Sequence, residues 1–221
     1  MEENIMNNKT LKKFVCAAML CAIAYIMVVI GRVPVIQFLS YDPKDIIITL
    51  GGLIWGPLMS CLISIVVSII EMVTISTTGL IGCIMNIIST CSFACTAAFI
   101  YKKKRTLSGA IIGLLAGSVT MIVVMLLWNY LITPLYMEVP RETVVTLLVP
   151  MFLPFNALKA GLNAAFTFLL YRPVISALRH AHLVDMQSGT SKKKFPLGFV
   201  LLAIAIIITC ILFILSFQGI I

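Results

Sequence analysis

Charged residues are scarce in this sequence. Only 11% of its 221 residues are Asp, Glu, Lys or Arg, whereas 61% are hydrophobic. A soluble domain carries about 25% charged residues, so this composition excludes a soluble globular enzyme. A membrane-spanning helix needs about 20 residues, so the length allows six or seven spans with short loops. The net charge of +8 then indicates orientation in a lipid bilayer rather than nucleic-acid binding.

Signals for catalysis and metal binding are also missing. The two histidines, His180 and His182, fall in a polar segment near the C-terminus, and no Ser/His or paired-carboxylate arrangement occurs at membrane depth. The sequence has no glycine-rich nucleotide loop. Its seven cysteines lie inside apolar runs without ligand-like spacing, which argues against a zinc site or a disulfide framework. We therefore expect no enzyme activity, no metal and no cofactor, and an energy source for transport outside this chain.

The apolar runs predict an all-α polytopic membrane protein. The long spans are expected at 11–30, 57–76, 80–101, 107–133, 150–171 and 195–217. A short helix at 45–55 makes a seventh span, because proline is favourable at a helix start but costly in its interior, and Trp55-Gly56-Pro57 therefore splits the apolar stretch. We divide the chain into a six-helix body (1–180), a cytoplasmic linker (181–194) and an additional transmembrane helix (195–221).

The basic residues support this division. Cytoplasmic loops of membrane proteins are enriched in Lys and Arg. When the short helix is counted, most basic residues fall on one side, in clusters at Lys9, Lys12 and Lys13, at 102–105, and at Arg172, Arg179 and 192–194. Arg32, Lys44 and Arg141 fall on the other side. The pattern predicts a cytoplasmic N-terminus and an external C-terminus.

Polar side chains that are costly to bury in a membrane lie at one depth in the predicted spans. At 1.5 Å rise per residue, five of them lie roughly 7–13 Å below the outer surface: Glu71, Asn86, Asn129, Asn156 and Lys159. Ionisable and amide groups at this depth indicate a functional site. Packing alone does not require one shared depth, so we interpret the group as a ligand pocket. The alternative is that the amides only join helices and that Glu71 and Lys159 form a structural ion pair.

The residue types indicate the kind of ligand. Asn156, Lys159 and Asn163 form one stripe on a helix, and amides offer both donors and acceptors. One Lys and one Glu nearly cancel in charge, so the pocket suits an uncharged heterocyclic or many-hydroxyl ligand better than an anion. Tyr41 and Tyr130 lie near the same outer face as candidates for stacking on a flat ring, although aromatic residues gather at any bilayer interface.

Residues 11–180 contain several short motifs. In chain order they are Tyr41-Asp42-Pro43-Lys44-Asp45, Trp55-Gly56-Pro57, Asn86, Asn129-Tyr130 with Pro134 and Tyr136, and Pro154-Phe155-Asn156-Ala157-Leu158-Lys159. In order and spacing they resemble those of the riboflavin-binding S components of energy-coupling factor (ECF) transporters. The resemblance implies a six-helix S-component body with an outward-facing riboflavin pocket, capped by the loop that carries Tyr41 and Asp45. Its binding groups fall on Asn129, Asn156 and Lys159, with Glu71 nearby.

The resemblance also implies partners in a bacterial plasma membrane. These are a transmembrane coupling subunit, contacting the small-residue face at Ala18 and Ala22, and two cytoplasmic ATPases. The helix at 195–217 is additional to that six-helix body. Other interpretations remain: an S component for another vitamin, an intramembrane enzyme that uses Glu71 as a base, or a membrane scaffold. The alanine face also fits packing within the chain itself.

Overall fold

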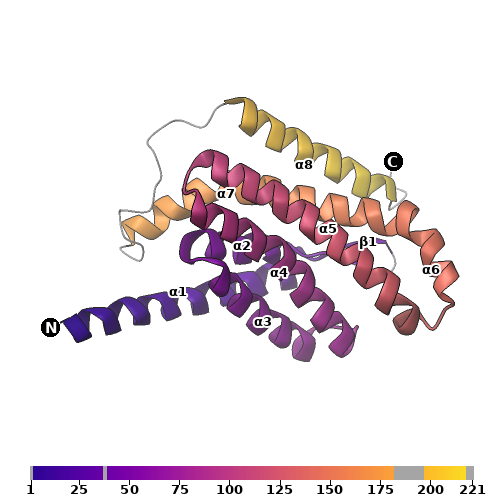
Figure 1. Cartoon of the computed structure of the whole chain (residues 1–221), viewed down its shortest axis with the longest axis horizontal. Helices are drawn as coiled ribbons and strands as arrows, with labels where there is room; N and C mark the ends of the chain where they lie inside the picture. Colours follow the sequence, from indigo (N-terminus) through magenta and orange to yellow (C-terminus); the bar gives the residue numbers. More distant parts are fainter. Residues whose placement is uncertain (1, 37–38, 182–196, 218–221) are drawn as a thin grey trace.

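Helices make up nearly the whole of the computed structural model, which describes residues 2–36, 39–181 and 197–217. In chain order they are α1 (Glu2–Gly31), α2 (Lys44–Trp55), α3 (Pro57–Thr74), α4 (Gly79–Lys103), α5 (Leu107–Met137), α6 (Arg141–Leu147), α7 (Leu153–His180) and α8 (Leu197–Phe217). One turn of π-helix, η1 (Leu148–Phe152), joins α6 to α7. Strands β1 (Val33–Ile36) and β2 (Leu39–Tyr41) pair antiparallel between α1 and α2. The all-α prediction is confirmed (Figure 1).

Six helical segments of the described chain are long and apolar enough to cross a membrane. They are α1, α3, α4, α5, the continuous stretch from α6 through α7, and α8. Helix α2 has 12 residues and rises about 18 Å, short of the hydrocarbon thickness of about 30 Å. The sequence analysis predicted a short helix here and counted it among the spans; α2 is indeed short, and it begins inside the protein, at the fully buried Lys44 and Asp45.

The break between α2 and α3 lies where the sequence predicted it. Gly56 adopts a φ of 103°, a conformation that favours glycine, and Pro57 follows at the first helical position, where its missing N–H is not needed. A Cβ at Gly56 would lie 3.9 Å from Cδ of Lys102. The turn therefore lies at the end of the molecule that carries the basic cluster at 102–105. Helix α2 thus brings the chain back to that end, as the distribution of basic residues requires, without crossing a full bilayer.

Segment 134–149, left outside the predicted spans, is largely helical. Helix α5 continues through Pro134 to Met137, and Glu138 ends it in the left-handed conformation at a φ of 54°. The chain becomes helical again at Arg141 and stays so through η1 into α7. Pro134 cannot donate a hydrogen bond to the carbonyl four residues before it, yet α5 continues for three more residues.

Helices α4 and α5 approach each other closely because glycine lines their contact. A Cβ at Gly117 would lie 2.6 Å from the carbonyl oxygen of Phe93, and a Cβ at Gly113 would lie 2.7 Å from that of Ala97. Both distances are too short for a side chain. Small residues allow transmembrane helices to approach this closely. The resulting van der Waals packing stabilises their association, because the hydrophobic effect does not drive helices together in lipid.

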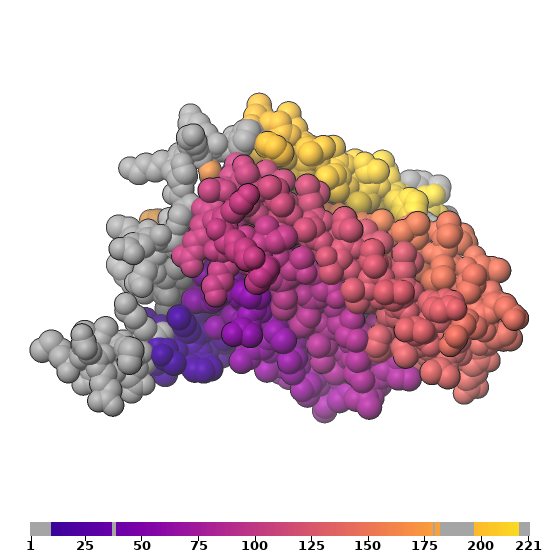
Figure 2. Space-filling model, in the orientation of Figure 1, coloured from indigo at the N-terminus to yellow at the C-terminus, as the bar shows by residue number. Residues whose placement is uncertain are grey.

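Helix α8 lies on the outer surface of the body, along α5 and α7 (Figure 2). It crosses α7 at Gly161, where a Cβ would lie 3.5 Å from Cγ2 of Ile206 and 3.6 Å from Sγ of Cys210. Most of its length has little cover from the rest of the chain. Apart from residue 181, the predicted linker at 181–194 lies outside the described residues.

We predict that Gly117→Ala destabilises the protein by about 1–3 kcal/mol, because the added methyl overpacks the contact with α4. Thermal unfolding of the purified protein in detergent measures this as a lower midpoint. Gly198→Ala is the matched control, since a Cβ at Gly198 in α8 meets nothing within 4 Å. Equal midpoints for the two variants would contradict the proposed backbone contact.

Candidate functional site

A hollow opens between α3, α4, α5 and α7, next to strand β2. It contains about 670 Å³ of space between atoms, counting the part that opens to solvent. The five polar residues that the sequence placed at one depth all line it: Glu71, Asn86, Asn129, Asn156 and Lys159. The structure thus brings together groups from four helices that are far apart in the chain.

Glu71 lies at the centre of a buried charge network. Its carboxylate pairs with the guanidinium of Arg32 and the ammonium of Lys44, and it accepts a hydrogen bond of 3.1 Å from Nδ2 of Asn86. Glu71 and Lys44 are almost completely buried. A buried charge is tolerated only when its partners are in place, so this network ties α3 and α4 to Arg32, which follows α1, and to the start of α2.

A second carboxylate, Asp45, holds the lysine of the pocket. Its Oδ2 lies 3.2 Å from Nζ of Lys159 and accepts a hydrogen bond of 3.1 Å from Nδ2 of Asn163. Thr90 donates to Oδ1 at 2.6 Å. Asp45 is fully buried and does not line the hollow. It therefore acts on the site by fixing Lys159, which does line it. The suggested pair between Glu71 and Lys159 was wrong, because each has other partners.

Asp42 connects the loop to both cations near Glu71. Its Oδ1 lies 2.7 Å from Nε of Arg32, and its Oδ2 lies 4.0 Å from Nζ of Lys44. Burial acts against ionisation of Asp42, but Lys44 and Arg32 more than offset it, so the pKa of this carboxyl lies below its usual value. With Asp45 and Lys159 included, three cations balance three carboxylates, and the site favours a ligand without net charge.

The two central amides each keep one group unpaired among the described residues. Oδ1 of Asn129 accepts a hydrogen bond of 3.0 Å from Thr133, which leaves its Nδ2 buried without a partner. Nδ2 of Asn156 donates to the carbonyl oxygen of Phe152 at 2.8 Å, which leaves its Oδ1 buried without a partner. Ser89 has a buried hydroxyl in the same condition. Unpaired buried polar groups are costly, so the pocket offers a fixed donor and a fixed acceptor to a ligand.

The π-turn η1 directly precedes the turn of α7 that carries Asn156. The carbonyl oxygen that it binds belongs to Phe152, the last residue of η1. Single π-turns inside helices are frequent at functional sites because they shift the following residues around the helix axis. Apolar side chains complete the wall beside the amides: Leu39, Met85, Met125 and Phe155.

Comparison with known proteins decides the family. Residues 12–171 match the family described as "ECF transporter, substrate-specific component". This chain belongs to that family. Two curated relatives carry the names "Riboflavin transporter FmnP", from Bacillus subtilis (strain 168), and "Riboflavin transporter RibU", from Staphylococcus aureus (strain TCH60). FmnP is 28% identical over 188 residues, which cover 78% of this chain and 98% of the relative.

The second relative and a solved structure give the same extent of similarity. RibU is 26% identical over 182 residues, covering 79% of this chain and 96% of the relative. The solved structure, described as "Structure and mechanism of the S component of a bacterial ECF transporter", aligns with a TM-score of 0.65 and 26% identity, over 77% of this chain and 99% of its own. The protein is thus a multi-pass membrane component of a transporter family, and α8 lies beyond the family match.

Two tyrosines named as site candidates do not line the pocket of this substrate-specific component. Tyr130 is 37% exposed, and the guanidinium of Arg141 lies 5.1 Å from its ring centre. Its neighbour Asn129 faces the pocket, and adjacent helical residues point about 100° apart. Tyr41 is buried in the apolar cluster between β2, α7 and α8. The residues of β2 that line the pocket are Leu39 and Ser40.

The small-residue face of α1 divides between interior and exterior. Ala17 and Ala24 are buried in the core against α2 and α3, whereas Ala18 and Ala22 are exposed on the opposite side of the helix. The alternative of packing within the chain therefore holds for Ala17 and Ala24. Ala18 and Ala22 leave a shallow apolar surface on this substrate-specific component where another helix can approach.

Three charged residues of the site escaped the sequence analysis: Arg32, Asp42 and Lys44. A signal for them exists. Arg32 and Lys44 are two of the three basic residues that break the charge rule, and they flank the one loop that holds two aspartates. Basic residues on the external side of the membrane, next to carboxylates, indicate a site in which the two kinds of charge pair.

We predict that Glu71→Gln destabilises the ligand-free protein by about 3–5 kcal/mol, because it leaves Arg32 and Lys44 without their shared carboxylate in a buried site. Thermal unfolding in detergent, without ligand, measures the loss. Glu142→Gln, at an exposed carboxylate in α6, is the matched control and keeps the wild-type midpoint. A wild-type midpoint for Glu71→Gln would show that the network does not hold the helices together.

Proposed function

We propose that this protein captures riboflavin from outside a bacterial cell and delivers it as the S subunit of an ECF importer. The family match and the two relatives named riboflavin transporters support this proposal. The observation that carries it is the neutral pocket with one free amide donor, Asn129 Nδ2, and one free amide acceptor, Asn156 Oδ1. A pocket with these properties selects for a flat, uncharged, hydrogen-bonding molecule.

The chemistry of riboflavin fits these groups. Its ring system is flat and uncharged, and one edge carries an imide, in which an N–H lies between two carbonyl groups. Asn129 would donate to a ring carbonyl and Asn156 would accept from the ring N–H. Leu39 and Phe155 offer apolar surface for the ring faces. Polar groups along the rest of the wall, including Lys159 and Asn86, suit the hydroxyl groups of the side chain.

The remaining site residues act through others. Asp45 orients Lys159, and Glu71 holds Asn86, Arg32 and Lys44. We assign no catalytic step to these groups, so Glu71 serves as a structural carboxylate and not as a base. The N-terminus would lie in the cytoplasm and the C-terminus outside, since the basic cluster at 102–105 lies at the end of the molecule opposite the pocket.

We predict that the purified protein binds riboflavin at about one molecule per chain, and that Asn129→Ala and Asn156→Ala each weaken the affinity about 10- to 100-fold. Each substitution leaves a ring group without its hydrogen bond in a buried site. Quenching of flavin fluorescence during titration measures the Kd. Tyr130→Leu is the control and retains the wild-type Kd, because Tyr130 lies outside the pocket.

The same titration separates the alternatives. Binding of a different vitamin from a panel, without riboflavin binding, would identify an S component of another specificity. Chromatography of the released flavin should recover it unchanged, and a chemically altered product would instead indicate an enzyme. If no vitamin binds and both asparagine variants only lower the unfolding midpoint, the protein is a scaffold and the proposal fails.

Energy would come from a transmembrane coupling subunit and two cytoplasmic ATPases, with the coupling subunit packed against Ala18 and Ala22. We predict that Ala18→Leu combined with Ala22→Leu abolishes co-purification with these subunits and leaves riboflavin affinity unchanged, because leucine prevents close helix approach. Affinity purification after co-expression measures assembly. Ala205→Leu, at an exposed alanine of α8, is the control and keeps the complex intact.

A further inference from the structure

Helix α8 makes specific contacts although it lies outside the family match, which ends at residue 171. One face of the helix turns toward the body, and its four members recur at helical spacing: Ala203, Ile207, Cys210 and Ile214. Cys210 lies 4.0 Å from the carbonyl oxygen of Leu158 on α7. The buried face therefore follows α7 from its cytoplasmic half toward the pocket.

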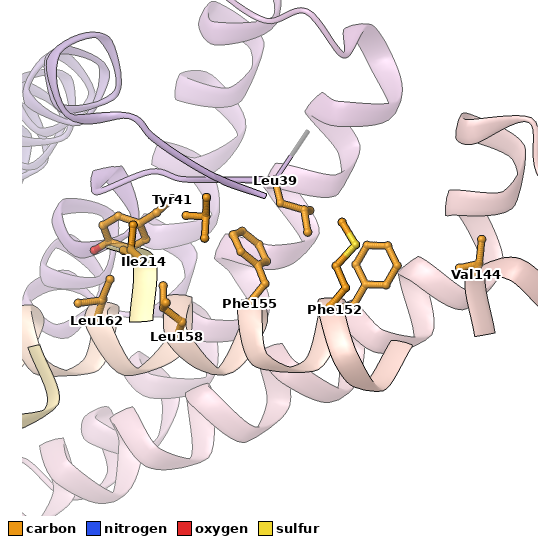
Figure 3. Packing of buried hydrophobic residues seen from close by; sticks show 10 residues of the cluster. Leu39, Tyr41, Val144, Phe152, Phe155, Leu158, Leu162 and Ile214 are labelled. Atoms are coloured by element: carbon orange, nitrogen blue, oxygen red, sulfur yellow. The ribbon is translucent and has the colours of Figure 1, made fainter. Parts of the chain in front are cut away.

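The last part of this face reaches the strands beside the pocket. Ile214 is 8% exposed and belongs to one apolar cluster with Val35 of β1 and with Leu39 and Tyr41 of β2. Figure 3 shows Ile214 next to Tyr41, close to Leu158 and Leu162 of α7. Helix α8 also contacts β1 directly. A helix that is otherwise open to lipid thus covers the outer side of the strand pair.

Strand β2 also contributes to the ligand site. Leu39 and Ser40 line the pocket, and Leu39 also belongs to the cluster that contains Ile214. The hydroxyl of Tyr41 is buried and has no hydrogen-bond partner among the described residues. Beyond the pairing of β1 with β2, apolar packing is therefore the main contact that β2 makes on this side.

We propose that α8, through Ile207 and Ile214, holds β1 and β2 closed beside the pocket and so sets the rate at which ligand leaves. The proposal rests on the proposed function, because it assumes that the pocket binds riboflavin. Leu39 and Ser40 form part of the pocket wall, so a shift of the strands widens the pocket and eases the exit of ligand. The contact with α8 opposes that movement, so Ile207 and Ile214 are positioning residues that do not themselves touch ligand.

The test is the full chain with Ile207→Ala and Ile214→Ala combined. We expect riboflavin to dissociate about tenfold faster, since removing packed side-chain atoms weakens the closed arrangement. Stopped-flow mixing with an excess of a non-fluorescent competitor measures the dissociation rate, as the recovery of riboflavin fluorescence. Ile204→Ala with Ile211→Ala is the matched control: the same change, at the same spacing on the same helix, at positions that are 42% and 46% exposed. The control retains the wild-type rate.

Hydrogen exchange in the ligand-free protein gives a second measurement that does not require riboflavin. Amides of β1 and β2 should exchange faster in the test pair than in the control pair, while those of α2 and α4 remain unchanged. A helix that serves stability alone would lower the unfolding midpoint without changing either the dissociation rate or the strand exchange, and that result overturns the proposal. Ile214→Val, a smaller change, should give an intermediate rate if the double variant does not fold.

The two measurements separate the two proposals. If wild-type protein does not bind riboflavin, the proposed function fails, and the exchange data still decide whether α8 holds the strands. If riboflavin binds and the test and control pairs dissociate at the same rate, the function stands and the role of α8 is refuted.

Discussion

The buried carboxylate of Glu71 is the constraint on which the site depends. It lies between Arg32 and Lys44 inside a membrane protein, where an unpaired charge would be strongly destabilising. The chain from Arg32 to Lys44, the first residue of α2, must therefore fold inward to supply both cations. That requirement closes one side of the pocket, and together with Asp42, Asp45 and Lys159 it leaves the site without net charge.

The shortness of α2 follows from the same constraint. A chain that has turned inward to reach Glu71 starts its next helix well below the membrane surface, so 12 residues suffice to reach the opposite end. Non-helical backbone at membrane depth is tolerated where it lines a cavity or is buried in protein. The loop and strand pair at this position meet both conditions, which explains why irregular structure occurs here in an otherwise helical chain.

The sequence predicted which residues line the pocket better than it predicted the ion pairs and hydrogen bonds that hold them. Depth along each span sufficed to group Asn129, Asn156 and Lys159, because helix rise is constant. Helix periodicity also contained the correction for Tyr130, since it and Asn129 cannot face the same side. The partners of Glu71 were beyond such reasoning: the loop has no period, and its path depends on contacts with helices far along the chain. The π-turn before Asn156 was hidden for a similar reason, since α-helical spacing was assumed throughout.

The lipid environment of α8 explains why its contact with the strands can form and break reversibly. Lipid is as apolar as isoleucine, so burial of Ile207 and Ile214 brings little hydrophobic gain, and association rests on close packing alone. Such a contact is weak and sensitive to shape. Gly161 of α7 lets Ile206 and Cys210 of α8 pack close to the α7 backbone, while Ile214 packs in one apolar cluster with side chains of the strands and α7. Release of Ile214 would therefore free the strands without detaching the helix.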